Sequence, residues 1–173
     1  VEEPEDAFYY VTVMNENIEM PPMPEGCREG ILRGLYRFAT AKEARDAAAL
    51  EAKADGLPIP RKLGAKAPRV RLLGSGAILG EARQAQAILR ERFGVAAEVW
   101  SATSWKELRT DAMACERWSR LNPGLPARQP YLTRMLQDSD EPVVAASAYL
   151  RALPDSVARW VPAPMAVLGT EGY

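Results

Sequence analysis

The chain has 173 residues, of which 47% are hydrophobic and 26% are charged, and its formal net charge is −1. This length suits one domain with a real core, and the charge balance excludes a general attraction to nucleic acid or anionic lipid. No apolar run approaches the roughly 20 residues of a membrane span, and no signal-peptide pattern opens the chain. We therefore expect a soluble, cytoplasmic protein.

The first predicted element is a strand over residues 8–14, because that run is rich in aromatic and β-branched side chains. Asn15, Glu16 and Asn17 follow it. One interpretation is that these residues line a subunit interface or the mouth of an active site that other domains complete. The other is that they only end the strand, with their amides bonding within their own turn. The proline-rich stretch 20–24 then excludes helix.

Two helices and a linker are predicted next. Residues 26–38 place apolar side chains at helical spacing, and residues 41–55 consist largely of strong helix formers. Thr40 and Glu43 have the spacing of a capping box, and Gly56 is placed to end the second helix. The apolar positions of that helix are mostly alanine, so we expect it to be weakly anchored at the surface. Residues 57–68, with three prolines and three bases, predict an exposed, protease-sensitive linker.

From residue 69 the pattern alternates between strands and helices. Strands are predicted over residues 70–73, 95–100, 142–146 and 165–168, and helices over residues 78–89, 104–121, 130–137 and 154–160. The strand–helix–strand order of residues 70–100 implies parallel strands joined by a right-handed crossover. The sequence therefore predicts an α/β fold in three layers, α/β/α, around a mostly parallel sheet.

A glycine-rich turn follows the strand at residues 70–73. Gly74, Gly76 and Gly80 open the next helix, and Glu98 lies about 20 residues further on, as in a dinucleotide-binding turn. The G-x-G-x-x-x-G spacing is one residue too long for that fingerprint. We interpret the turn as tight packing between strand and helix, with Gly76 as the residue in contact. A nucleotide-binding module is the alternative.

The chain lacks histidine, the side chain best suited to proton transfer near neutral pH. Its two cysteines, Cys27 and Cys115, have neither metal-ligand nor redox spacing. Of the four tryptophans, Trp118 and Trp160 lie on apolar helix faces and are predicted to be inside. Trp105 directly follows the capping residue Ser104 and is the better candidate for an interface.

Charge is unevenly distributed along the chain. Residues 1–25 carry seven acids and no base, whereas residues 28–71 carry eleven bases and five acids. The basic patch at residues 61–71 is either part of a docking surface for an acidic partner or a solvated face that keeps the protein in solution.

Five stretches, in this order, carry a resemblance to a known family. They are FYYVTVMNEN running into the proline loop (8–26), VRLLGSG (70–76), VWSATSW (99–105), CERW with Asn-Pro (115–123) and VLGTEG (167–172). Together they resemble the C-terminal domain of the bacterial homodimeric pyruvate dehydrogenase, a thiamine-diphosphate-dependent member of the transketolase-like superfamily. Residues 39–68 depart from that pattern by being longer and richer in alanine.

The resemblance implies a five-stranded sheet whose first strand is antiparallel. It also implies that residues 1–173 are one C-terminal domain, cut from a larger chain at both ends, with residues 39–68 as an inserted helix and linker. The parent enzyme would use thiamine diphosphate and magnesium to decarboxylate pyruvate and would pass the acetyl group to a lipoyl group. Its partners would be the rest of its polypeptide, a second subunit of a homodimer and the lipoyl acyltransferase. A paralogue acting on 2-oxobutanoate is an alternative.

The family's Gly-Asp-Gly and paired-asparagine signature for magnesium diphosphate is absent from the sequence. We therefore expect no catalytic, cofactor-binding or metal-binding residue in this segment, and no activity from it alone. We expect a structural and dimerisation role instead. The strands at residues 8–10 and 165–168 should expose apolar surface that the rest of the polypeptide and a second subunit cover, so the chain should self-associate.

Overall fold

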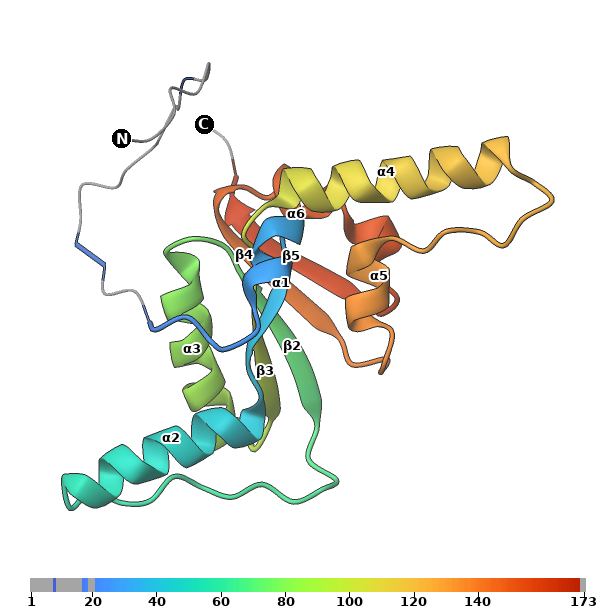
Figure 1. Ribbon diagram of the computed structural model, residues 1–173. Coiled ribbons are helices and arrows are strands. Elements are labelled where there is room, and N and C mark those ends of the chain that lie inside the picture. The colour runs from blue at the N-terminus through green and yellow to red at the C-terminus, as the bar shows by residue number, and fades with distance from the viewer. Residues whose placement is uncertain (1–7, 9–16, 19–20, 172–173) are drawn as a thin grey trace.

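The computed structural model describes residue 8, residues 17–18 and residues 21–171 (Figure 1). The predicted strand at 8–14 therefore lies outside the described residues, apart from Phe8, which is exposed. In chain order the elements are α1 (Arg28–Arg33), β1 (Tyr36–Ala39), α2 (Ala41–Ala54), β2 (Arg69–Gly74), α3 (Ile78–Ile88), a π-helical turn η1 (Leu89–Phe93), β3 (Ala96–Ser101), α4 (Trp105–Leu121), α5 (Tyr131–Leu136), β4 (Val143–Leu150), α6 (Ala152–Asp155), a 3₁₀ turn η2 (Ala158–Trp160) and β5 (Met165–Thr170).

The sheet has the strand order β1-β3-β2-β4-β5 among the described residues. Strands β3, β2, β4 and β5 are mutually parallel, and β1 pairs antiparallel with β3. This confirms the mostly parallel sheet with an antiparallel first strand. The antiparallel strand, however, is Tyr36–Ala39.

Alternate residues of the central strands supply cores on the two faces of the sheet. On one face Leu73 and Trp100 pack with residues of α4 and α5, such as Leu108 and Leu132. On the other face Leu72 and Val99 lie in the cluster that α3 covers. Figure 1 shows α3 on one side of the sheet and α4 and α5 on the other. Period-2 alternation within buried strands therefore produces the predicted three layers.

The first helix ends earlier than the sequence predicts. Gly34 adopts a φ of 94° and caps α1 after Arg33, and the amide of Leu35 donates to the carbonyl of Gly30 (2.9 Å). A Cβ on Gly34 would lie 2.6 Å from the carbonyl oxygen of Ser104, so no other residue fits here without movement. The prediction of helix through Phe38 is wrong, because this left-handed turn redirects the chain into β1.

Helix α2 begins where the sequence predicts. The hydroxyl of Thr40 accepts from the amide of Glu43 (3.1 Å), and the carboxylate of Glu43 accepts from the amide of Thr40 (2.7 Å). At the other end the amide of Leu57 donates to the carbonyl of Ala52 (2.7 Å) across Gly56. Residues 57–68 then follow as the predicted linker, and most of its side chains are exposed.

The helix predicted from residue 154 to Trp160 is two separate turns. Helix α6 starts at Ala152, two residues before Pro154, and ends at Asp155, and η2 follows at Ala158–Trp160. Pro154 lies in the first turn of α6, as predicted, but the prediction that this helix continues to Trp160 is wrong. Of the helices in the described part of the chain, none has the length and apolar character needed to cross a bilayer.

Candidate functional site

The carboxyl ends of the parallel strands form the first candidate site. Strand β2 is flanked by β3 on one side and by β4 on the other. The chain runs from β2 to β3 first and crosses to β4 later, so the direction of the strand order reverses between β2 and β4. Ligands of open α/β sheets favour the crevice outside such a switch point. The turn at residues 75–77 lies here, and the amide of Ser75 donates to the carbonyl of Ala146 (3.2 Å).

The glycines of this turn differ in role from the prediction. A Cβ on Gly74 would lie 2.9 Å from Leu79 Cα and 3.0 Å from the carbonyl oxygen of Ile78, so Gly74 is the residue that lets α3 pack against β2. A Cβ on Gly76 would have no described atom within 4 Å. The prediction that Gly76 provides the packing contact is therefore wrong. Gly76, with a φ of 56°, provides the left-handed turn.

The backbone of the turn is already hydrogen-bonded. The amides of Ile78, Leu79 and Gly80 donate to carbonyls of residues 75–77 at 3.1–3.2 Å. The helix cap, Ala77, has no side-chain hydrogen bond. A phosphate cradle needs free amides at the helix start, so this geometry does not favour dinucleotide binding.

Glu98, the acid in the predicted ribose position, is used elsewhere. It is 8% exposed, and its carboxylate lies 3.8 Å from the guanidinium groups of both Arg69 and Arg71. It also accepts from the indole of Trp100 (3.4 Å). Since Arg71 pairs with Glu98 near the middle of the strands, the carboxylate is not at the carboxyl edge.

Arg71 is the centre of a buried ionic cluster. Only 2% of its surface is exposed, and its guanidinium donates to the carbonyl of Leu136 (2.5 Å) and to Asp138. Its Nε lies 3.6 Å from the carboxylate of Glu141, which also pairs with Arg69. These contacts join β2, β3 and the loop between α5 and β4, so we assign the cluster a structural role.

Of the residues predicted to line an interface, the structure describes Asn17 and Trp105. Asn15 and Glu16 lie outside the described residues, and Asn17 is exposed and outside any helix or strand. Trp105 is the first residue of α4 and is 6% exposed, packed in the core cluster that contains Leu108. Within this chain, little of the Trp105 side chain is left for a partner.

The two thiols do not form a nucleophilic site. Cys27 is buried, Cys115 is half-buried, and both are free. Burial raises the pKa of the Cys115 thiol, which keeps it protonated and unreactive. Among the described residues, no group of three or more Cys, Asp or Glu side chains is placed to hold a metal ion.

An uncovered face of the sheet is the stronger candidate for function. On the side that carries α3, strands β4 and β5 expose Ala148, Leu150, Ala166, Leu168 and Thr170. Leu150 is 50% exposed and Leu168 is 59% exposed. We call these five residues the β4–β5 face. Met165 and Val167, on the opposite side of β5, pack against the core, so the predicted exposure of this strand holds for one face of it.

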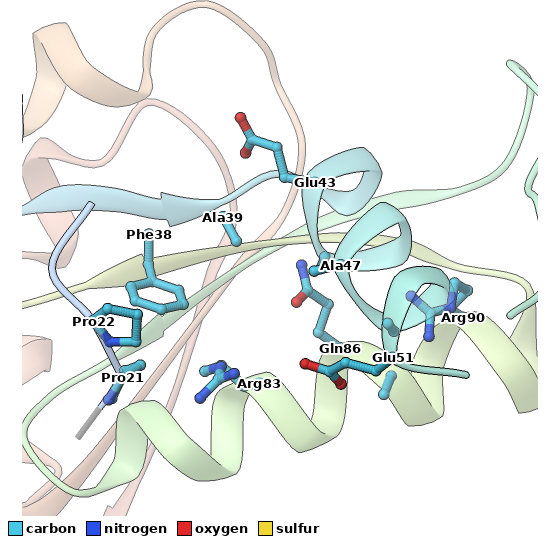
Figure 2. A pocket seen from close by; sticks show the side chains of 13 residues that line it. Pro21, Pro22, Phe38, Ala39, Glu43, Ala47, Glu51, Arg83, Gln86 and Arg90 are labelled. Atoms are coloured by element: carbon cyan, nitrogen blue, oxygen red, sulfur yellow. The ribbon is translucent and has the colours of Figure 1, made fainter. Parts of the chain in front are cut away.

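Two grooves flank α2. One, of about 380 Å³, lies between α2 and α3, and Figure 2 shows Phe38 and the two prolines Pro21 and Pro22 at one end of it. Arg83 lies over the Phe38 ring at 5.5 Å from its centroid. The other groove, of about 410 Å³, lies on the side of the linker.

Comparison with known proteins adds a further finding. Residues 60–173 match the family model described as the transketolase-like TK C-terminal domain. The chain is 41% identical to the pyruvate dehydrogenase E1 component of Pseudomonas aeruginosa, over 100% of the chain and 17% of that protein. It is 38% identical to the proteins of the same name from Escherichia coli K12 and Mycobacterium tuberculosis, over 99% of the chain and 17% and 16% of each relative. The chain thus spans about a sixth of the length of these relatives.

Proposed function

We propose, on the premise that the chain belongs to the transketolase-like C-terminal domain family, that it is the structural and dimerisation domain of a cytoplasmic pyruvate dehydrogenase. The relatives that it resembles over its whole length are named pyruvate dehydrogenase E1 component. The parent enzyme would oxidatively decarboxylate pyruvate and transfer the acetyl group to a lipoyl group. Its partners would be a second subunit and the lipoyl acyltransferase of the complex.

The observation that carries the structural role is the β4–β5 face. A sheet in a three-layer domain normally has helices on both faces, and here the outer part of one face is apolar and open. Contact with another protein surface would bury the exposed apolar area of Leu150 and Leu168. Such contact is favourable by roughly 25 cal/mol for each Å² of apolar surface buried. We infer that the β4–β5 face packs against the second subunit.

Thiamine diphosphate and magnesium would provide the decarboxylation chemistry of the parent. The glycine turn that opens α3 does not fit a diphosphate, because its amides are already engaged by the turn carbonyls. We therefore propose that the cofactor sites, and the residues that choose pyruvate over 2-oxobutanoate, lie in other parts of the parent enzyme. The isolated chain should then show no dye reduction with either 2-oxo acid when both cofactors are added. Turnover above a buffer blank would contradict this.

Sedimentation of this chain at several concentrations tests the contact role. The weight-average mass should rise with concentration, and Leu168→Glu should weaken self-association at least tenfold, because a charge would be buried in an apolar contact. Leu50→Glu is the matched control, since Leu50 is 73% exposed on α2, away from the β4–β5 face. A monomeric wild-type chain, or equal effects of the two substitutions, would refute the proposal.

A further inference from the structure

The charged side chains that line the groove on the linker side of α2 are almost all positive. It has a volume of about 410 Å³ and is enclosed by the first turns of α2, the linker, the start of β2 and the π-helical turn η1. Of the described residues that line it, one is acidic, Asp46, and six are basic: Lys42, Arg45, Arg61, Lys62, Arg69 and Arg90. We call this feature the basic groove.

Carboxylates neutralise only part of this charge. Lys42 and Arg45 share a single acid, Asp46, at 2.8 and 2.7 Å. Within the described part of the chain, Arg61 and Lys62 form no ion pair.

The other two bases have acids of their own. Arg90 pairs with Glu91 at 2.7 Å, and Arg69 pairs with Glu141. Three of the six positive charges therefore remain without a carboxylate of their own. All six basic side chains line the same groove.

The rim of the basic groove is held in position by hydrogen bonds. The amide of Arg61 donates to the carboxylate of Glu91 (3.2 Å), and the guanidinium of Arg61 lies beside Gly94 at the end of η1. At the far end of the linker, the amide of Ala96 donates to the carbonyl of Pro68 (2.8 Å). These two bonds hold the linker backbone at residues 61 and 68.

We propose that the basic groove binds a small anion that carries two or more phosphate groups. Guanidinium groups match phosphate oxygens in pairs. The volume lies within the range of roughly 300–1,000 Å³ that is typical of small-ligand sites. Leu63 and Ala96 supply an apolar part of the lining that a compact organic group could contact. This site is separate from the β4–β5 face and does not depend on the function proposed above.

Titration calorimetry with inorganic pyrophosphate at low salt tests the site. We expect saturable binding to one site per chain that weakens as salt rises, because exposed charge pairs are screened. The double variant Arg61→Gln, Lys62→Gln should bind at least tenfold more weakly. Neither side chain is buried or ion-paired within the described residues, so the variant should fold.

The control is Lys106→Gln, Arg109→Gln, which removes the same charge from exposed positions on α4. It should leave the pyrophosphate affinity within twofold of wild type. Equal losses in the two double variants would mean a general charge effect and would overturn the proposal, as would the lack of saturable binding by the wild type. Displacement of pyrophosphate by a lower concentration of hexaglutamate would assign the groove to an acidic protein segment, and would also overturn it.

Discussion

Replacing the buried Arg71 with methionine should destabilise the domain more than any surface arginine could. Methionine retains much of the side-chain volume, so the change mainly removes the guanidinium. Glu98 and Glu141, whose side chains are 10% and 13% exposed, would then keep Arg69 as their one ion-pair partner among the described residues. Asp138 and the carbonyl of Leu136 would each lose a donor.

The expected loss follows from leaving buried charge uncompensated. Breaking a buried ion pair by removing one partner costs about 3–5 kcal/mol. We expect a value near the lower end, about 3 kcal/mol, because Arg69 still contacts both glutamates and Asp138 is exposed. In a domain of this size that corresponds to a fall in melting temperature of about 6–12 °C.

Urea unfolding of wild type and variants at neutral pH measures this difference. Arg151→Met is the control, since Arg151 also pairs with two acids, Asp155 (3.3 Å) and Glu171 (2.9 Å), but is half exposed. It should cost much less than Arg71→Met, because exposed ion pairs contribute little to stability. Adding Glu98→Gln to Arg71→Met should recover part of the loss by removing an unpaired charge. Similar losses for the two single variants would refute the reasoning, because burial would then not decide the cost.

Three further outcomes follow from local geometry. Gly74→Ala should lower the free energy of unfolding by about 1–3 kcal/mol through backbone clashes, and Gly76→Ala by about 1 kcal/mol through its left-handed φ. A larger loss for Gly76→Ala than for Gly74→Ala in urea unfolding would contradict the packing role of Gly74. Hydrogen bonds from Thr40 hold the pKa of Glu43 below its ordinary value, so the cost of Thr40→Ala, about 1 kcal/mol at neutral pH, should shrink as pH falls through that lowered pKa. An unchanged cost in acid would contradict it. Limited trypsin digestion should cut within residues 57–68 before it cuts within α3.

The sequence alone determined the elements whose signals are local. The capping box at Thr40, the alternation of strands and helices after residue 69 and the resemblance of five stretches to one family all depend on residues close together in the chain. These predictions agree with α2, with β2 to β5 and with the family match. A helix or strand of this kind is stabilised by hydrogen bonds and apolar contacts between residues close in the chain. The spacing of those residues in the sequence therefore predicts the helix or strand.

Apolar periodicity alone could not predict where α1 ends and β1 begins, on either side of Gly34. Apolar residues from Ile31 to Phe38 fit helical spacing, yet Leu35 is in the core of one sheet face and Phe38 packs at the other. A glycine within the run was a signal for a helix end, because glycine is common just after a helix in the left-handed conformation. The close approach of Ser104 to Gly34 is a contact over 70 residues, and no local pattern contains it.

Tertiary structure alone decided which residues are available to a partner or a ligand. Trp105 has the sequence context of an interface residue but is buried, Glu98 is paired with arginines, and Leu150 and Leu168 meet on one open face. The basic groove likewise gathers side chains from α2, the linker, β2 and η1, which are up to about fifty residues apart. The exposure of a side chain and the net charge around it depend on residues that are distant in the sequence and that the fold brings close to it. The sequence therefore determined the family and most of the elements, and the packing of those elements decided where a site can be.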